Sequence, residues 1–170
     1  MPIAPTPDSQ LLDSASGTFF RAIDPAFREH ALDGARSAGR YNRPGQRTLY
    51  LSGSRDGVAA AMIAHTDDTT PEREILEISV RADRIVDLRD PEVGTRFGFD
   101  PADAAADWQH LLDEHGRPRI TAPPSWQVRD LLESAGAHGL IDPSRKAPGL
   151  WHLVLFDWNS GPDSPHVEVP

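Results

Sequence analysis

The chain has 170 residues, a length that suits one domain, and its 17 basic and 26 acidic side chains give a formal net charge of −9. This charge argues against a general nucleic-acid-binding protein, which needs a basic surface. The sequence has no cysteine, which excludes disulfides and cysteine-ligated metals, and no apolar run near the roughly 20 residues that a membrane-spanning helix requires. We therefore expect a cytoplasmic protein that contacts neither nucleic acid nor membrane directly.

Composition predicts one folded domain between two loose ends. Residues 1–16 are rich in proline and polar side chains and are expected to form a flexible arm. Residues 160–170 have a similar composition and are expected to form a tail. The folded domain is therefore expected over residues 17–159.

The first half of this domain is predicted to contain short strands and one helix. Strands are expected at Thr18–Ile23 and, after a Pro-Gly turn, at Thr48–Ser52. Apolar residues at helical spacing predict a helix over Arg55–His65. Alternating apolar residues then predict a strand over Glu74–Val80, and a second short strand is expected at Arg84–Leu88 after a turn.

The second half is predicted to contain two helices and a closing strand. Asp100 and the proline after it are a helix-start signal, and the apolar face behind them, which includes Trp108, predicts a helix that ends near Gly116. A further helix is expected over Pro124–Ala135 and a strand over Trp151–Phe156. Because strands and helices are mixed without regular alternation, we expect an α+β fold with a mostly antiparallel sheet and peripheral helices.

Several widespread catalytic and binding motifs are absent from the sequence. It contains no G-x-x-x-x-G-K-[ST] phosphate-binding loop, no G-x-G-x-x-G fingerprint and no G-x-S-x-G nucleophile elbow. The seven histidines are scattered, without the spacing of a metal-binding motif. We therefore expect no metal and no resident cofactor.

One segment, Arg36–Arg55, differs in composition from the rest of the chain. It contains five arginines and no acidic residue, so its local charge of +5 leaves −14 for the remainder. Arginine binds phosphate oxygens, tyrosine rings stack on bases, and glycine lets the backbone approach a ligand closely. This mixture suits a nucleotide with a pyrophosphate. The alternative is a solvated basic loop that pairs with the acidic remainder, and composition does not decide between the two.

Five sequence blocks together resemble the RES domain family, whose name comes from its Arg, Glu and Ser positions. The most specific block is Gly-Arg-Tyr-Asn-Arg-Pro-Gly at Gly39–Gly45. The other four blocks are Phe20–Ala22, Thr48–Ser52, Gly139–Arg145 and Leu153–Phe156. Their order and spacing match the family over most of the chain, from Thr18 to Phe156.

The resemblance implies a fold related to ADP-ribosyltransferase toxins and a role as the toxin of a toxin–antitoxin pair. Family members consume NAD by cleaving its nicotinamide–ribose bond, with water or inorganic phosphate as the acceptor, and some transfer ADP-ribose to a protein. NAD is then a substrate and not a cofactor. The implied protein partner is a small helical antitoxin of the Xre type.

The resemblance also assigns roles to residues of this chain. The family arginine corresponds to Arg21 or Arg40, of which Arg40 lies in the stronger motif, and the family serine corresponds to Ser144. The implied catalytic residues are Arg40, Ser144 and Tyr50. The implied NAD-binding residues are Arg21, Tyr41, Asn42, Arg43 and Arg145.

The family glutamate is missing from this chain. Its expected position is Ala61, or Met62 after a slip of one residue, and neither side chain ionises. A carboxylate there would stabilise the cationic ribose of the transition state or orient the nucleophile. Three alternatives stay open: another carboxylate replaces it, the reaction is weaker or different, or the protein binds a nucleotide or partner without turnover. The nearest substitutes in sequence are Asp56, Asp67, Glu74 and Glu77.

Overall fold

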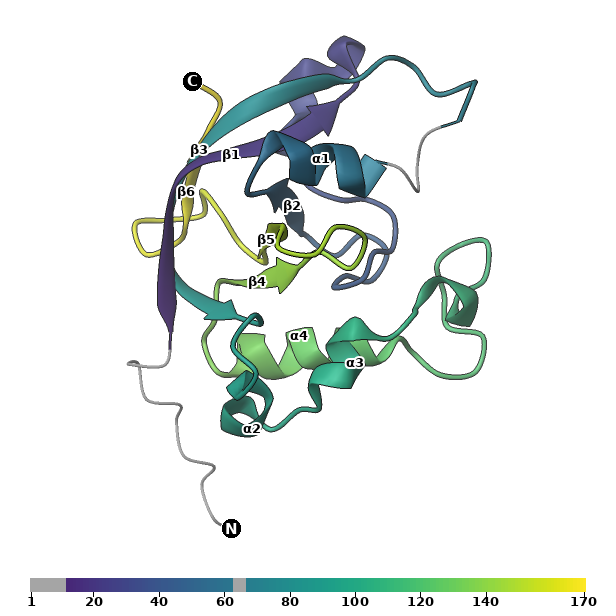
Figure 1. The fold of residues 1–170 in the computed structure, drawn as a ribbon, viewed down its shortest axis with the longest axis vertical. Helices are drawn as coiled ribbons and strands as arrows, with labels where there is room; N and C mark the ends of the chain where they lie inside the picture. The colour runs from purple at the N-terminus through teal and green to yellow at the C-terminus, as the bar shows by residue number, and fades with distance from the viewer. Residues whose placement is uncertain (1–11, 63–66) are drawn as a thin grey trace.

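The fold is a small closed β-barrel; most of its helices lie below it in the view of Figure 1, and helix α1 (Arg55–Met62) lies higher, beside the barrel. The computed structural model describes residues 12–62 and 67–170. The strands are β1 (Asp13–Ile23), β2 (Leu49–Ser52), β3 (Glu74–Asp87), β4 (Gly139–Pro143), β5 (Trp151–Leu155) and β6 (His166–Glu168). The strand order is β1-β2-β5-β4-β3, and β3 pairs again with β1 to close the ring, while β6 extends one edge of β3.

The strand pairing confirms the expected α+β class with a mostly antiparallel sheet. Every pair is antiparallel except β3 with β4, which run parallel. The barrel interior is filled by alternate apolar residues of the strands, such as Leu51 and Leu153. The intervening residues, such as Tyr50 and Val154, face outward into a second apolar cluster with the helices.

Strand β3 corrects the prediction of two separate strands. It runs without interruption from Glu74 to Asp87, because the alternation of buried and exposed residues continues through Ala82. Arg84, with φ of 58°, marks a local bend, and its Nε donates a hydrogen bond to the Gly136 carbonyl at 2.6 Å. The polar residues that predict a turn instead form the solvent-facing side of one long strand.

The helices are α1 (Arg55–Met62), α2 (Val93–Phe97), α3 (Pro101–Ala105) and α4 (Pro124–Ser134), with 3-10 turns η2 (Pro25–His30) and η4 (Gln109–Leu111). Helix α4 agrees with the predicted helix to within one residue, and the predicted end of the first helix, residues 63–65, lies outside the described residues. None of the helices in the described ranges is long and apolar enough to span a bilayer.

The predicted helix from Asp100 to Gly116 is wrong beyond its first turns. Asp100 does cap α3, since its carboxylate accepts a hydrogen bond from the Ala102 amide at 2.9 Å. The helix ends at Ala105 because arginine side chains from elsewhere bind the carbonyls that would continue it. As a result Trp108, expected in the core, is only half-buried and lines a cavity.

Both ends of the chain contribute to the sheet. Strand β1 begins at Asp13, before the predicted start of the domain at Gly17. Strand β6 lies within the predicted tail and pairs with β3 through Val167 opposite Val80. The sheet therefore extends beyond residues 17–159 in both directions.

Candidate functional site

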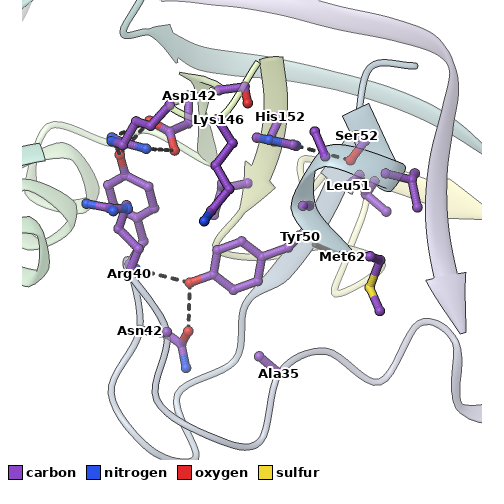
Figure 2. Close-up of a pocket in the computed structure, with 18 of the residues that line it drawn as sticks. Ala35, Arg40, Asn42, Tyr50, Leu51, Ser52, Met62, Asp142, Lys146 and His152 are labelled. Atoms are coloured by element: carbon purple, nitrogen blue, oxygen red, sulfur yellow. Dashed lines mark hydrogen bonds and ion pairs between the residues drawn. The ribbon is translucent and has the colours of Figure 1, made fainter. Parts of the chain in front are cut away.

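A cavity of about 920 Å³ lies against the outer face of β2, β5 and β4 (Figure 2). Its walls come from β1, residues 35–42, α1, residues 107–110 and residues 144–146. This volume is at the upper end of the roughly 300–1,000 Å³ of small-molecule sites. The cavity is therefore large enough for an extended ligand such as a dinucleotide.

Three polar side chains form a row across neighbouring strands on the cavity floor. Ser52 of β2 pairs with His152 of β5, and His152 pairs with Asp142 of β4. Residues directly opposite each other in antiparallel strands have side chains on the same face. Ser52 Oγ lies 3.1 Å from His152 Nδ1, and burial lowers the pKa of His152.

Asp142 is the carboxylate at the centre of this wall, and its oxygens are fully engaged. The Tyr41 hydroxyl donates to Oδ1 at 2.8 Å, while Arg145 donates to Oδ1 at 3.0 Å and to Oδ2 at 2.8 Å. Burial and the neighbouring carboxylate raise the pKa of Tyr41 well above its usual value. Asp142 therefore holds Tyr41 and Arg145 in place, and Arg145 balances its charge. Tyr41 has no exposed surface, so its ring offers no face on which a ligand could stack.

Tyr50 forms a wall of the cavity with its ring, and its hydroxyl is engaged (Figure 2). The hydroxyl donates to Asn42 Oδ1 at 2.7 Å and accepts from the Tyr41 amide at 3.0 Å. The Asn42 amide nitrogen donates to the carbonyls of Ser37 and Arg43, both at 2.9 Å. Burial raises the pKa of Tyr50, so its hydroxyl stays protonated.

Helix α4 fixes the loop that carries Arg40. Trp126 Nε1 donates to the Gly39 carbonyl at 2.9 Å, the Ser125 hydroxyl donates to the Arg40 carbonyl, and Arg129 Nη1 donates to the Tyr41 carbonyl at 2.9 Å. Three consecutive carbonyls are thus held by one helix. This arrangement fixes the backbone direction and leaves the Arg40 side chain on the cavity wall.

Arg40 connects the cavity to the end of α3. Its Nη1 donates to the carbonyls of Ala104 at 3.0 Å and Ala106 at 2.6 Å. Burial, followed by the nearby positive charge of Arg145, lowers the pKa of Arg40. Arg40 therefore both holds residues 104–106 at the rim and adds positive charge to the cavity.

Arg21 is the least satisfied polar group near the cavity. Within the described part of the chain, its Nη1 is the one buried side-chain nitrogen or oxygen without a hydrogen-bond partner. Burial lowers the pKa of Arg21, and Asp33 opposes this effect. A buried unpaired donor is costly in free energy and calls for a missing partner. Nη1 has almost no accessible surface, so a ligand in the cavity could pair with it only after the Arg21 side chain moves.

Two further polar side chains lie on the loop after β4. The Ser144 hydroxyl accepts from the Ala147 amide at 3.2 Å, which leaves its proton available to a ligand. Lys146, the one lysine of the chain, reaches into the cavity (Figure 2). Both residues are therefore placed to contact a bound molecule.

The structure brings seven of the eight sequence-predicted site residues to this cavity. The seven are Arg21, Arg40, Tyr41, Asn42, Tyr50, Ser144 and Arg145. The NAD-binding role expected for Arg43 does not fit the structure. Its guanidinium makes two hydrogen bonds to Asp130, at 2.9 and 2.7 Å, and lies over the Trp126 ring away from the cavity.

Most of the basic segment Arg36–Arg55 does not form a ligand site. Four of its five arginines make ion pairs with acidic residues of other segments: Arg36 with Asp33, Arg43 with Asp130, Arg47 with Asp157, and Arg55 with Glu77. Of the five, Arg40 alone lines the cavity. Most of this segment is therefore a basic loop that pairs with acidic residues, which is the second of the two interpretations of its composition.

The position expected for the family glutamate faces the cavity. Ala61 and Met62 of α1 both line it. The four acidic substitutes proposed from sequence do not: Glu74 pairs with Arg28, Glu77 pairs with Arg55, Asp67 accepts from Thr69, and Asp56 is exposed. The carboxylates that do line the cavity are Asp107 and Asp142.

Sequence reasoning missed Ser52, His152, Asp142 and Lys146 as cavity residues. Alternation along the closing strand separates His152 from the barrel-facing Leu153, which is a usable signal. The strand register that places Ser52 and Asp142 beside it is not readable from the sequence. No cluster of three or more potential metal-ligating side chains occurs among the residues described.

Comparison with known proteins agrees with this architecture. The chain shares its fold with a chain in the crystal structure of the M. tuberculosis MbcT–MbcA toxin–antitoxin complex, with a TM-score of 0.61 and 14% identity over 96% of this chain and 87% of that one. No match is found among curated proteins by sequence. Residues 18–170 match the RES domain. The chain therefore belongs to the RES domain family.

Proposed function

We propose that this protein is the toxin of a toxin–antitoxin pair and consumes NAD by cleaving the nicotinamide–ribose bond. The observation that carries the proposal is a cavity of about 920 Å³ whose lining includes Arg21, Arg40, Arg145 and Lys146. Four cationic side chains line this cavity against two carboxylates. Arginine donors and excess positive charge suit the pyrophosphate of a dinucleotide.

The proposed binding mode assigns each side of NAD to a different part of the cavity. Arg21 and Arg40 hold the pyrophosphate, and the Tyr50 ring bounds the nicotinamide. The Ser144 hydroxyl, whose proton is available, donates to the nicotinamide ribose or to the carboxamide. The reaction is a dissociative cleavage at the ribose carbon, with water or inorganic phosphate as the acceptor.

The test follows free nicotinamide from NAD, with and without inorganic phosphate, beside a calorimetric measurement of NAD binding. We expect nicotinamide release, and we expect Arg40→Ala and Ser144→Ala each to lower it at least tenfold. Arg96→Ala, which removes an exposed arginine paired with Asp90, is the matched control. NAD binding without release in either buffer would rule out the enzyme.

A second candidate function is a RES domain that binds NAD or a partner without turnover. The observation that favours it is the cavity-facing pair Ala61 and Met62, where the family places its glutamate. This candidate predicts NAD binding with no nicotinamide release. A third outcome, protein ADP-ribosylation in the manner of the related toxin fold, would appear as transfer of label from NAD to protein.

The proposed partner is an antitoxin protein of the Xre type. The support for it is the fold shared with a chain from a toxin–antitoxin complex. Co-expression with the product of a neighbouring gene should yield a stable complex with reduced NAD consumption. Independent elution of the two proteins in gel filtration would argue against that partner.

A further inference from the structure

The Ser52–His152 pair occupies the floor of the cavity and is not part of the family assignments made above. His152 Nδ1 lies 3.1 Å from Ser52 Oγ, and both residues line the cavity. In the described part of the chain, Nε2 makes no hydrogen bond and is not among the buried unpaired atoms, so it is open to the cavity. Figure 2 shows the imidazole between Ser52 and Lys146. One ring nitrogen is thus fixed and the other is available to a ligand.

The surroundings of His152 favour the neutral imidazole. Burial lowers the pKa of His152, Arg145 lowers it further, and Asp142 opposes both. The other ionisable residues that line the cavity are Arg21 of β1, Tyr50 of β2, Lys146 after β4, Arg40 and Tyr41 of residues 35–42, and Asp107 and His110 of residues 107–110. The cavity-lining residues of α1 in the described range carry no ionisable group. A neutral imidazole at neutral pH can accept a proton.

We propose that His152 is the general base of the NAD cleavage described above, held in position by Ser52. This inference rests on the proposed function and adds the group that accepts the proton of the acceptor molecule. This role requires the tautomer in which Nδ1–H donates to Ser52 Oγ, which leaves the Nε2 lone pair toward the cavity. This arrangement provides base chemistry in a site whose glutamate position holds Ala61 or Met62.

The chemical step balances without an additional reactant. The bond between the ribose carbon and the pyridinium nitrogen breaks, and its electron pair leaves with nicotinamide, which becomes neutral without taking a proton. The oxygen of water forms the new bond to the ribose carbon, and its proton passes to His152 Nε2 and then to solvent. The products are nicotinamide, ADP-ribose and one proton.

The test compares pH–rate profiles of nicotinamide release for the wild type, His152→Gln and Ser52→Ala. General-base catalysis contributes about 10²–10⁴-fold, so His152→Gln should lower kcat about 100-fold or more with little change in KM for NAD. The wild-type kcat should fall at low pH, where His152 becomes protonated. The kcat of His152→Gln should not show this decrease at low pH. Ser52→Ala should lower kcat less than His152→Gln does, and it should move the pH at which kcat decreases. His138→Gln, a half-buried histidine outside the cavity, should keep the wild-type profile.

The outcomes separate this inference from the proposed function. An active wild type with an unchanged His152→Gln profile would overturn the role of His152 and leave NAD cleavage standing. A wild type that binds NAD without releasing nicotinamide would overturn both. If His152→Gln does not fold, an NMR titration of the wild-type histidine side chains with ADP-ribose tests the role of His152 instead. A shifted His152 resonance and pKa support the inference, and an unperturbed one contradicts it.

Discussion

The hydroxyl of Tyr41 donates a hydrogen bond to Asp142 across 2.8 Å, although the two residues lie 101 positions apart in the chain. The contact joins the loop that carries Arg40 to β4 and the loop that carries Ser144. Their association around one neutralised carboxylate creates the cavity wall, so the stability of this contact and the binding of a ligand should be linked.

We predict that the two tyrosines remain un-ionised until the protein unfolds. They are the only tyrosines of the chain, Tyr41 is buried and Tyr50 is partly buried, and the pKa of each is raised. A raised folded-state pKa gives stability that is complete below the unfolded value of about 10 and is lost as pH rises above it. In an alkaline titration, tyrosinate absorbance should therefore rise together with the loss of circular dichroism. Tyrosinate formation in the folded protein near pH 10 would contradict this.

Tyr41→Phe should lower the free energy of unfolding at neutral pH by about 1 kcal/mol, because it removes one hydrogen bond while Arg145 still neutralises Asp142. The same variant should show a weaker loss of stability above pH 10, because it lacks one of the two groups whose ionisation is suppressed. Urea unfolding at neutral and alkaline pH measures both effects. Identical pH dependence in wild type and variant would contradict the assignment of Tyr41.

Arg21→Met should stabilise the protein and weaken NAD binding. A buried donor without a partner costs about 1–3 kcal/mol, so its removal should raise the free energy of unfolding by about 1 kcal/mol. The loss of a charge-assisted contact to phosphate should weaken NAD affinity about tenfold or more. Urea unfolding and calorimetry test the two effects. Arg81→Met, at an exposed position of β3, is the control and should change neither quantity.

The sequence predicts the strands and helices whose apolar pattern is local. It does not predict an element whose end depends on a side chain from a distant part of the chain. Helix α4 and strands β2 and β5 follow directly from apolar spacing. The helix predicted after Asp100 fails because Arg40 binds the carbonyls of Ala104 and Ala106. No local pattern contains that information.

The same distinction applies to the site. The motif at Gly39–Gly45 places Arg40 on the cavity wall, but the neighbouring Arg43 turns to Asp130 of α4. Alternation places His152 on the outer face, but its contacts depend on its neighbours on the adjacent strands, Ser52 of β2 and Asp142 of β4, which the sequence does not reveal. Strand register sets such neighbours, and register follows from the closure of the whole barrel.

Gly39→Ala should disrupt the cavity without a change in its charge. A Cβ at this position would lie 2.7 Å from the Tyr50 hydroxyl and would also collide with Asn42 Oδ1, so the Tyr50–Asn42 hydrogen bond should break. Overpacking of this kind costs about 1–3 kcal/mol of stability. The affinity for NAD should fall together with the stability. Gly161→Ala, where a Cβ would meet nothing within 4 Å, is the control for unfolding and calorimetry.

Ala61→Glu should increase the rate of nicotinamide release. Ala61 lies on α1 and lines the cavity, so a carboxylate there would face the site where positive charge develops on the ribose. One preorganised charged group contributes about 3 kcal/mol, or about 100-fold in rate. The matched control is Ala59→Glu on the same helix, which adds the same charge at an exposed position outside the cavity. Faster release in Ala61→Glu alone would show that the cavity retains the geometry of an NAD-cleaving site. Equal rates in both variants and wild type would show that the glutamate position no longer contributes to the chemistry.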